Sequence, residues 1–450
     1  MPTGTIDSAI FKDIFGTEAM RQVWSDGNRI QKYLDFEAGL ARAQARLKII
    51  PQEACDEILK HVKVEQYDIA KLKTETERIG YPVLPVVSQL VKLCKDGLGE
   101  WCHWGATTQD ITDSATIMQI REGLAIIEKD INDISDALAA LAKKHRNTVM
   151  AGRSNLQQAV PITFGYKCAT YLAAFERHKQ RLQQLKERTF VFEFGGAAGT
   201  LSSLGKDGLR TQVELAKELN LAQPEIAWHT VHDRIAEVGC FLGLVTGICN
   251  KIAYDVKLMM QTEVEEVYEP FHEGRGSSST MPQKRNPISC VYITAQTGVV
   301  RSQVMALLNA MEQDHERATG QWEIEWIVLP EIFTLTAGCL SQTKFLVSGL
   351  QVDEKKMRSN LDITKGLIVS EAVMMGLGPY LGRQYAHDLV YDICRKVVAT
   401  GRPLADLLAE NAEISKHLSK AELAKLCDPA NYLGQAGEMV DRVLELRQRR

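Results

Sequence analysis

The sequence predicts an all-α protein with a central bundle of long helices. Prolines are absent from residues 86–160, 162–223, 225–269 and 288–329, and stretches of that length without proline favour long helices. Within them apolar residues recur every three or four positions, which is the period of one helix face. Patterns typical of strands are nearly absent.

We expect three domains, because a chain of 450 residues exceeds what one hydrophobic core usually supports. They are an N-terminal helical domain (1–110), a central long-helix bundle domain (111–350) and a C-terminal helical domain (351–450). The second boundary rests on the change from LVSGLQ to the polar VDEKKMRSN.

Two apolar stripes define the expected bundle. The first steps by three and four through Ile117, Ile120, Leu124, Ile127, Ile131, Ile134, Leu138 and Leu141. The second belongs to a helix expected from about Arg234 to Val267, which would be on the order of 50 Å long. On it Gly239, Gly243 and Gly247 recur every fourth residue, a spacing that favours close contact between helices. Helices of this length indicate a bundle whose apolar stripes are shared with other subunits.

Charge and composition argue against several classes of protein. The formal net charge of −4 gives no reason to expect nucleic acid or an anionic membrane as a partner. No apolar run reaches the roughly 18 residues that span a bilayer, and the start MPTGTIDSAIFKD lacks the features of a signal peptide. Ten cysteines lie singly without CxxC spacing, which favours buried thiols in a reducing cytosol over disulfides or structural zinc. We therefore expect a cytoplasmic protein.

The first polar stretch that interrupts the helical pattern is HWGATTQDITDS, residues 103–114. Thr107, Thr108 and Asp110 fall where a helix begins, just before the first apolar stripe. Their side chains suit helix capping. The free N–H groups and hydroxyls of a helix start also suit a carboxylate ligand, so the spacing leaves both interpretations open.

A second polar stretch, GRSNLQQAVPITFG at residues 152–165, places three polar side chains between apolar segments. These are Arg153, Asn155 and Gln157. The stretch predicts either a solvated turn or amides that face a substrate, and the pattern does not decide between them.

Two further stretches combine histidines with acidic residues. In WHTVHDR (228–234), His229, His232 and Asp233 could share a helix face as metal ligands do, but no other cluster at a useful spacing supports a metal site. DHERATGQWEIEW (314–326) carries His, Arg, Trp and Glu inside a helical stretch. Polar or ionic groups that line an interior are costly unless they are paired or used.

The stretch GRGSSSTMPQKRNP, residues 274–287, is a polar loop between two helical segments. It lacks the GxxxxGK[ST] pattern of a phosphate-binding loop, and no strand precedes it. A plain linker would not need Lys284 and Asn286 held beside prolines. A mobile lid that carries reactive groups fits better, because its serines and N–H groups donate and its cation and amide can hold a carboxylate.

Residues 278–287, SSTMPQKRNP, match the signature SSxMPxKxNP of the fumarase/aspartase superfamily at each fixed position. Further segments that resemble the superfamily follow in its order, among them GATTQD, GRSNLQQA, FGGAAGTLSSLG, DHER, NLDITKGLIVSEAV and DPANYLGQA. Within the superfamily the chain is most similar to the bacterial 3-carboxy-cis,cis-muconate cycloisomerases, through HWGATTQD, WHT..DR and HER....W..EW. Adenylosuccinate lyases are the nearest other branch.

This resemblance implies a three-domain homotetramer whose active sites are shared between subunits. It implies a reaction without cofactor or metal, in which a group is added or removed β to a carboxylate through an aci-carboxylate carbanion. Ser278 matches the family's general base, and the cation of Lys284 would stabilise its oxyanion; these are the expected catalytic residues. Contacts to the substrate are implied for Thr107, Thr108, Asn155, Gln157, Ser279, Met281, Asn286, Arg317, His103 and His229.

Three departures from the family pattern bear on the substrate. Asn155 stands where most branches carry a histidine proton donor and where muconate cycloisomerases are expected to carry tryptophan, so another group must supply any acid. Gln283 replaces a histidine that is usual in the muconate and adenylosuccinate branches. The Arg-Tyr and Arg-His-Asp segments that adenylosuccinate lyases use to hold the nucleotide are missing, and DIFGTEAM and ETERIGYPVLP occupy those regions. A nucleotide phosphate would be poorly held without those arginines.

The leading interpretation is a 3-carboxy-cis,cis-muconate cycloisomerase acting on a small polycarboxylate. The alternative is a C–N lyase that cleaves an N-substituted aspartate to fumarate and an amine, which Asn155 and Gln283 keep open. A catalytically silent scaffold of the same fold is the third, and the joint presence of Ser278, Lys284, Asn286 and Thr108 argues against it.

Overall fold

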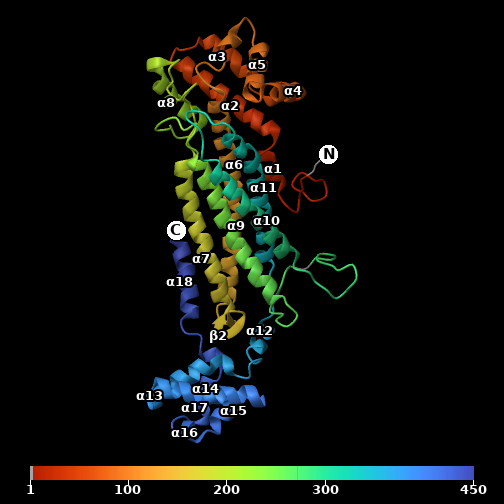
Figure 1. Cartoon of the computed structure of the whole chain (residues 1–450), viewed down its shortest axis with the longest axis vertical. Coiled ribbons are helices and arrows are strands. Elements are labelled where there is room, and N and C mark those ends of the chain that lie inside the picture. Colours follow the sequence, from red (N-terminus) through yellow and green to blue (C-terminus); the bar gives the residue numbers. More distant parts are fainter. Residues whose placement is uncertain (1–3, 271, 450) are drawn as a thin grey trace. The chain divides into compact units, whose positions relative to one another are not determined.

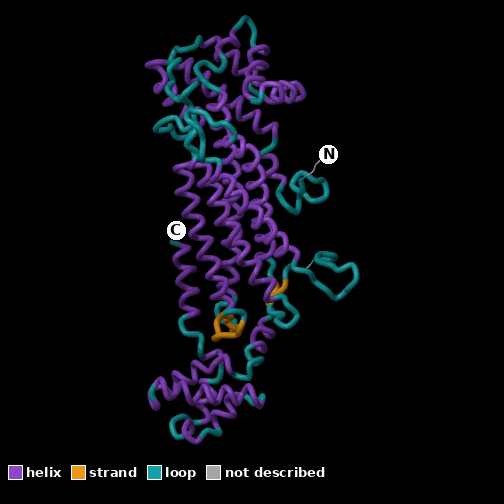
Figure 2. The backbone as a smooth tube through the Cα atoms, viewed as in Figure 1, coloured by secondary structure: helices purple, strands orange, loops and turns teal. Residues whose placement is uncertain are grey.

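Helices form most of the structure, a computed structural model that describes residues 4–270 and 272–449 (Figures 1 and 2). The prediction of an all-α protein is therefore confirmed. The chain separates into two compact units, each made of three segments. Unit one comprises Met1–Asp130, Lys179–Gly247 and Ala295–Ser341, and unit two comprises Ile131–His178, Ile248–Thr294 and Gln342–Arg450. The division into three domains stays a prediction.

In unit one, shorter helices lie near the 21-residue helix α2 (Asp26–Arg46). They are α1 (Glu18–Val23), α3 (Gln52–Ile58), α4 (Ile69–Ile79), α5 (Val83–Leu93) and α8 (Gly208–Leu219). Helix α2 packs against α3 and α8 (Figure 1), and Arg46 at its end forms ion pairs of 2.5 Å with Glu214 and Glu218 of α8. Ser25 caps α2 by accepting a hydrogen bond from the N–H of Asn28, which is the preferred chemistry at a helix start.

Five long helices contribute residues to both units. They are α6 (Thr108–Lys144), α7 (Phe164–Thr189), α9 (Asp233–Met259), α10 (Ile288–Asn309) and α11 (Gln321–Ser348). The first apolar stripe is confirmed along α6, where its residues from Ile117 to Leu138 are at most 1% exposed. The burial of one face at this spacing explains why the segment is helical.

Helix α9 ends earlier than expected. The sequence predicts a helix to about Val267, but α9 ends at Met259. Glu263, Glu265 and Glu266 follow, and negative charges at a helix C-terminus oppose the helix dipole. The chain instead turns into a short strand, β3 (Val267–Tyr268), which pairs antiparallel with β4 (Gln351–Val352).

The expected close approach of α9 to another helix is confirmed at two of its three glycines. A Cβ atom on Gly239 would lie 2.5 Å from Leu307 Cδ1 of α10, and one on Gly243 would lie 3.0 Å from Val304 Cγ2. Nothing among the described residues lies within 4 Å of the corresponding position on Gly247. The first two glycines therefore let α9 and α10 pack closely.

A hairpin in unit two is the main strand structure that the sequence did not indicate. Strand β1 (Val149–Ser154) pairs antiparallel with β2 (Gln157–Thr163). The two residues between them, Asn155 and Leu156, have φ angles of 51° and 64°. This left-handed pair is typical of the two-residue turn that joins hairpin strands, and Asn adopts it readily.

The rest of unit two is helical. It contains α12 (Glu354–Asn360), α13 (Ser370–Leu381), α14 (Arg383–Thr400), α15 (Leu404–Ala409), α16 (Ala412–Ser415), α17 (Lys420–Leu426) and α18 (Ala436–Gln448). Buried aliphatic residues of α13 to α17, such as Leu377, Val390 and Leu404, form one hydrophobic cluster. Arg146 joins α18 to this unit through a two-pronged ion pair with Asp441.

Short 3₁₀ helices complete the described elements: η1 (Leu59–His61), η2 (Val64–Gln66), η3 (Leu98–Trp101), η4 (Gly205–Asp207), η5 (Leu367–Val369) and η6 (Pro429–Asn431). By length and composition, α9 and α11 could each cross a membrane. However, 61% and 67% of their most apolar windows are buried within the structure, which is the pattern of core helices. All ten cysteines are free thiols.

Candidate active site

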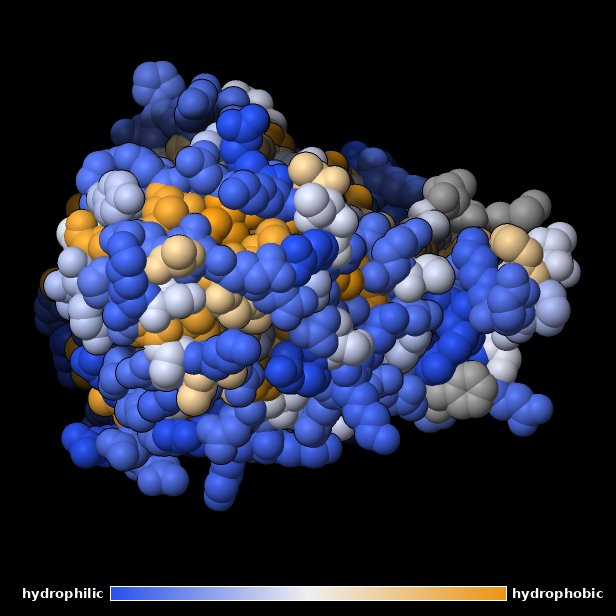
Figure 3. Space-filling view, turned by 90° about the horizontal axis from the view of Figure 1, so that it is seen from below, coloured by the Kyte–Doolittle hydropathy of each residue, from blue (hydrophilic) through white to orange (hydrophobic). Residues whose placement is uncertain are grey.

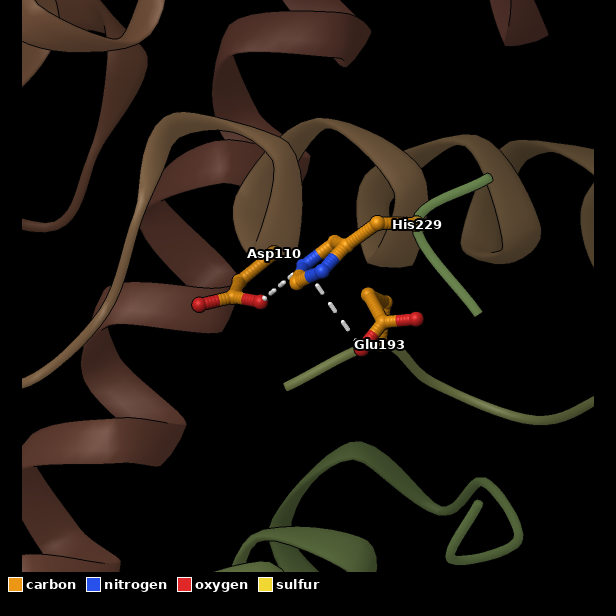
Figure 4. A group of neighbouring side chains, drawn as sticks. All are labelled: Asp110, Glu193 and His229. Atoms are coloured by element: carbon orange, nitrogen blue, oxygen red, sulfur yellow. Dashed lines mark hydrogen bonds and ion pairs between the residues drawn. The ribbon is translucent and has the colours of Figure 1, made fainter. Parts of the chain in front are cut away.

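A buried group of ionisable side chains lies at the start of α6 in unit one (Figure 4). His229 Nε2 is 2.7 Å from Asp110 Oδ1 and 3.7 Å from Glu193 Oε1. All three side chains are at most 4% exposed. Figure 4 shows the imidazole ring directed toward both carboxylates. Buried charges of this kind are costly unless they are paired or used.

Backbone N–H groups fix the Asp110 carboxylate. Its Oδ2 accepts hydrogen bonds from the N–H of Thr107 at 2.9 Å and of Gly196 at 3.0 Å, and its Oδ1 accepts from Gly195 at 2.8 Å. The bond to Thr107 is the reciprocal half of a capping box, with the acidic side chain reaching back to the residue before the helix. Asp110 therefore caps α6.

The hydroxyls of Thr107 and Thr108 are not consumed by this capping. Both residues are half-buried, and neither hydroxyl has a hydrogen-bond partner among the described residues. The sequence left open whether these residues cap the helix or bind a carboxylate, and Asp110 is the one that caps it. The two threonine hydroxyls stay available at a helix N-terminus, where an anion is favoured.

Two of the three ionisable groups have shifted pKa values that follow from burial and charge. Burial raises the pKa of Glu193 to about 7, although the neighbouring His229 opposes this. Burial lowers the pKa of His229, but the hydrogen bond to Asp110 and the charge of Glu193 outweigh it, so the net shift is upward. Glu193 Oε1 is buried without a hydrogen-bond partner. The charge of Glu193 can therefore change near neutral pH.

Arg317, from the loop before α11, joins the same cluster. Its Nη1 donates to Gln109 Oε1 and its Nη2 donates to the carbonyl of Ala197 at 2.7 Å. Gln109 in turn donates through Nε2 to the carbonyl of His229 at 2.6 Å. The structure thus brings together Arg317, His229 and the start of α6, three places that the sequence analysis had singled out separately.

His103 is held by a different carboxylate. Its Nδ1 lies 2.7 Å from Glu37 Oε1, and its backbone N–H donates to Glu37 Oε2 at 3.0 Å. Burial lowers the pKa of His103, but the charge and hydrogen bond of Glu37 outweigh it and raise the pKa overall. Its expected contact with a substrate stays a prediction.

A second buried histidine has its own acidic partners. His232 Nδ1 lies 2.8 Å from Glu325 Oε1, and its Nε2 lies 3.1 Å from the carbonyl of His229 and 3.5 Å from Asp113 Oδ2. Trp322 Nε1 donates to Asp113 Oδ1 at 2.8 Å. The spacing of three residues between His229 and His232 was the sequence signal for this second group, and together with Asp233 it was interpreted only as a possible metal pattern. The same spacing between Asp110 and Asp113 is a signal that the sequence analysis did not use.

The two histidines therefore do not act as one pair of metal ligands. Asp110, Glu193 and His229 do bring one ligand atom each within 4.8 Å of one another. However, the two oxygens of Asp110 already accept from three backbone N–H groups and the imidazole. This donor set suits a carboxylate fixed by hydrogen bonds, and the cluster fits an ionic network better than a metal centre.

The loop at 274–287 belongs to unit two and has a defined geometry at its serine. Ser278 Oγ accepts hydrogen bonds from the N–H groups of Thr280 at 3.3 Å and Met281 at 3.1 Å. Two backbone donors directed at one hydroxyl oxygen favour its deprotonated form. This agrees with the donor-rich loop that the sequence indicates.

Asn286 closes the base of this loop. Its Nδ2 and its backbone N–H both donate to the carbonyl of Gly276, at 2.8 Å and 3.0 Å. Gly276 has a φ of 71°, and a Cβ atom there would lie 2.6 Å from the carbonyl oxygen of Asn286, so only glycine fits. Lys284 and Ser279 are exposed, and neither side chain has a hydrogen bond or ion pair with another described residue.

Asn155 and Gln157, also in unit two, are exposed at the turn of the β1–β2 hairpin. Arg153 on the same hairpin is used structurally, because it forms a two-pronged ion pair with the fully buried Glu266. Asn360 Nδ2 adds a hydrogen bond of 2.9 Å to the same carboxylate. Of the three polar residues in this stretch, the two amides are therefore the ones free to face a ligand.

Comparisons with known proteins agree with these features. Residues 12–302 match the family described as "Lyase", and residues 366–443 match the one described as "Adenylosuccinate lyase C-terminus". The chain is 59% identical to "Trans-aconitate decarboxylase 1" of Mycosarcoma maydis, over 99% of this chain and 90% of that protein. It is 44% identical to the "3-carboxy-cis,cis-muconate cycloisomerase" of Pseudomonas aeruginosa, over 97% and 95%.

A solved structure shares the fold over almost the whole chain. The "3-carboxy-cis,cis-muconate lactonizing enzyme" of Pseudomonas putida superposes with a TM-score of 0.93 at 40% identity, and the match covers 98% of this chain and 99% of that one. Fold and sequence therefore point to the same group of enzymes.

Proposed function

Because this chain belongs to the lyase family of the fumarase/aspartase superfamily, we propose that it decarboxylates a small unsaturated tricarboxylate without a cofactor. Trans-aconitate is the first candidate. Support for the substrate comes from the relative named a trans-aconitate decarboxylase, which is 59% identical over 99% of the chain. Support for the chemistry comes from the residues of the two groups described above.

The reaction balances through the kind of carbanion that the superfamily uses. The carboxylate on the methylene carbon of trans-aconitate leaves as CO₂, and its bonding electron pair forms a new double bond to the central carbon. The former double-bond electrons move to the carbon next to another carboxylate, which becomes an aci-carboxylate. That carbon then takes one proton. The products are CO₂ and 2-methylidenesuccinate.

Asn155 is the observation that favours this reaction over an elimination. An amide cannot donate a proton at neutral pH, and the resembling enzymes that expel an amine or hydroxyl carry a histidine there. A carboxylate that leaves as CO₂ needs no proton. At the exposed turn of the hairpin, Asn155 and Gln157 instead offer neutral donors that can orient a carboxylate.

In this proposal Ser278 moves the proton. A decarboxylation requires a donor to carbon, so the Ser278 hydroxyl acts as general acid at the position where related enzymes place a base. The N–H groups of Thr280 and Met281 stabilise the alkoxide that this transfer leaves. The exposed Lys284 adds a positive charge that no described residue neutralises. Solvent then returns the proton to Ser278.

A tricarboxylate needs several donors, and unit one supplies a set of them. The Thr107 and Thr108 hydroxyls and Arg317 bind carboxylate groups in this proposal. His229 contributes through Nδ1, which has no hydrogen-bond partner among the described residues, while Nε2 is held by Asp110. The raised pKa of His229 favours the cation, which strengthens such a bond. His103, Ser279, Met281 and Asn286 complete the proposed contacts.

Cycloisomerisation of 3-carboxy-cis,cis-muconate is the second candidate. It is favoured by the 44% identical relative and by the superposed structure of that name. Both candidates are unsaturated tricarboxylates that react through a carbanion next to a carboxylate, so the same donors serve either one. Cleavage of an N-substituted aspartate is the third candidate. Asn155 and Gln283 keep it open because they depart from the muconate cycloisomerase pattern, but it ranks last because an amine leaving group needs a proton that the Asn155 amide cannot donate.

We also propose that the enzyme is a homotetramer with sites shared between subunits. Several large apolar side chains on the long helices are exposed in the single chain: Leu244 (54%), Val291 (48%), Val299 (49%), Met305 (58%) and Ile327 (67%). Figure 3, a view onto one end of the molecule, shows further apolar residues exposed among polar ones there. Burial of such side chains against identical helices would stabilise an assembly.

Turnover of a defined substrate panel tests the proposal. Purified protein is incubated separately with trans-aconitate, 3-carboxy-cis,cis-muconate and a set of N-substituted aspartates, and proton NMR follows the products. We expect 2-methylidenesuccinate and CO₂ from trans-aconitate, with Ser278→Ala inactive and the neighbouring Ser277→Ala active. Exclusive turnover of either other substrate would replace the leading reaction by that one, and turnover of none would refute the assignment.

A further inference from the structure

A pocket in unit one lies apart from the residues used in the proposed reaction. It has a volume of about 320 Å³ and is lined by residues of α2, α4 and α5 together with Trp326 of α11. Volumes near 300 Å³ are at the lower end of the range for small-molecule sites. Ile30, Leu72 and Val86 form apolar walls and are 8%, 5% and 1% exposed.

Two hydrogen-bond donors in this pocket have no acceptor. Arg29 Nε and Trp326 Nε1 are both buried and without a partner. Arg29 makes no ion pair with any described carboxylate, and its polar neighbour is the neutral hydroxyl of Tyr33. A buried donor left unpaired destabilises the fold, and a charged one does so more strongly. A guanidinium and an indole N–H together suit a carboxylate.

The charges around Arg29 limit the ligand to a single carboxylate. Lys73 and Glu77 at the rim neutralise each other through an ion pair of 2.5 Å. Asp26, one helical turn before Arg29, is exposed at the rim and lies beyond ion-pair distance from it. Its negative charge would repel a second or third carboxylate. The pocket therefore differs in charge from a site for a tricarboxylate.

We propose that this pocket binds a small monocarboxylate with an alkyl or aromatic body. The carboxylate accepts from Arg29 and Trp326, and the body packs on Ile30, Leu72 and Val86. This site goes beyond the proposed decarboxylation and does not depend on it.

The aromatic residues around Trp326 provide a reporter for binding. The Trp326 and Trp322 ring centroids are 4.9 Å apart in an edge-on arrangement, and Tyr81 lies 6.0 Å from Trp322 and 6.1 Å from Trp326. A carboxylate hydrogen-bonded to the Trp326 indole changes the polarity at that ring. Binding should therefore alter tryptophan fluorescence.

Benzoate and hexanoate are suitable probes, with benzamide and hexanamide as uncharged controls of the same shape. The full-length protein is titrated with each by calorimetry and by tryptophan fluorescence. We expect dissociation constants of about 1 mM or below for the acids, and binding at least tenfold weaker for the amides. Failure of both acids to bind at 10-fold higher concentration, or equal binding of the amides, would refute the site.

Substitutions locate the binding. Arg29→Met retains the apolar stem and should weaken the acids at least tenfold, whereas Arg29→Lys should restore part of the affinity. Trp326→Phe retains a ring without the N–H, and should weaken binding even if Arg29→Met fails to fold. Arg210→Met, at an exposed arginine of α8, is the matched control. Unchanged affinity in both Arg29→Met and Trp326→Phe would place the ligand elsewhere.

The candidate active site provides the last comparison. Ser278→Ala should bind benzoate as the unmodified protein does, and trans-aconitate should not displace benzoate. Loss of benzoate binding in Ser278→Ala, or displacement by trans-aconitate, would assign the probe to the catalytic site. Inactivity toward trans-aconitate with intact benzoate binding would instead contradict only the proposed reaction.

Discussion

At the scale of single residues, the proton on Glu193 links the buried cluster to pH. Burial raises the pKa of this carboxyl to about 7, from about 4.5 for an exposed one. Between pH 4.5 and about 7, the Glu193 carboxyl is therefore protonated in the folded state and ionised in the unfolded state. The protonated Glu193 carboxyl contributes to the free energy of unfolding. This contribution is fully present below pH 4.5 and is lost as pH rises through about 7.

Glu193→Gln should remove this part of the pH dependence. The amide cannot ionise, and its carbonyl can still accept from the Trp228 N–H that Glu193 uses. We expect the free energy of unfolding to fall less between pH 5 and pH 8 in this variant than in the unmodified protein. Urea unfolding at several pH values measures it, with the exposed Glu225→Gln as control. Parallel profiles for Glu193→Gln and the unmodified protein would contradict the assignment.

Substitution of Asn155 tests whether this residue orients the substrate or transfers protons. Its φ of 51° suits Asn, Asp and Gly, so Asn155→Asp should preserve the hairpin turn. If the residue only orients a carboxylate, the rate constant kcat should fall far less in Asn155→Asp than in Ser278→Ala. Steady-state kinetics of the two variants decide this. A loss as deep as that of Ser278→Ala would give Asn155 a direct part in the proton transfer.

At the scale of elements, local patterns predicted the helices but not what ends them. The spacing from Ile117 to Leu138 predicts α6 because it records burial of one helix face. The acidic residues after Met259 oppose continuation of α9, but the pairing of Val267 with Val352 that follows is contained in no local pattern. A turn at Asn155 was one of two interpretations left open, and its flanking strands were not predicted.

Long-range partners limited prediction of the site in the same way. Thr108, His229 and Arg317 were each indicated by a motif. Asp110 and Glu325 also lie in indicated stretches, but their bonds to the buried histidines were not predicted, because the partners are 119 and 93 residues apart in the sequence. Only the folded chain brings these carboxylates to the imidazoles.

Gly239 tests the close approach of α9 and α10. Its Cβ would lie 2.5 Å from Leu307 Cδ1, so Gly239→Ala should overpack the contact and lower the free energy of unfolding by about 1–3 kcal/mol. Gly247→Ala is the matched control, because no described atom lies within 4 Å of its Cβ position and alanine favours helix by about 1 kcal/mol. Thermal unfolding compares them. Equal stability of the two variants would contradict the close approach.

At the scale of the whole molecule, the proposed homotetramer would build each active site from residues of different subunits. Thr108 belongs to unit one, and Asn155 and Ser278 belong to unit two. In the resembling superfamily the matching stretches meet from three subunits. Homotetramers of Thr108→Ala and of Ser278→Ala should then each be nearly inactive, for different reasons.

Mixing these two variants after partial dissociation should restore activity. Random mixing of equal amounts would leave about a quarter of the sites with both intact contributors under closed symmetry. Native mass spectrometry shows whether mixed tetramers form, and the turnover assay shows whether they work. Mixed tetramers as inactive as their parents would rule out a site built from different subunits.

The position of one deuterium in the product tests the proposed carbanion most directly. Trans-aconitate is incubated with the protein in D₂O, and proton NMR locates the new deuterium in 2-methylidenesuccinate. The account predicts loss of the carboxylate on the methylene carbon, followed by protonation at the former double-bond CH next to its own carboxylate. The deuterium then lies in the –CHD–COO⁻ group. Deuterium in the =CHD group would mean direct loss of the carboxylate on the double bond, and would contradict an aci-carboxylate intermediate protonated by Ser278.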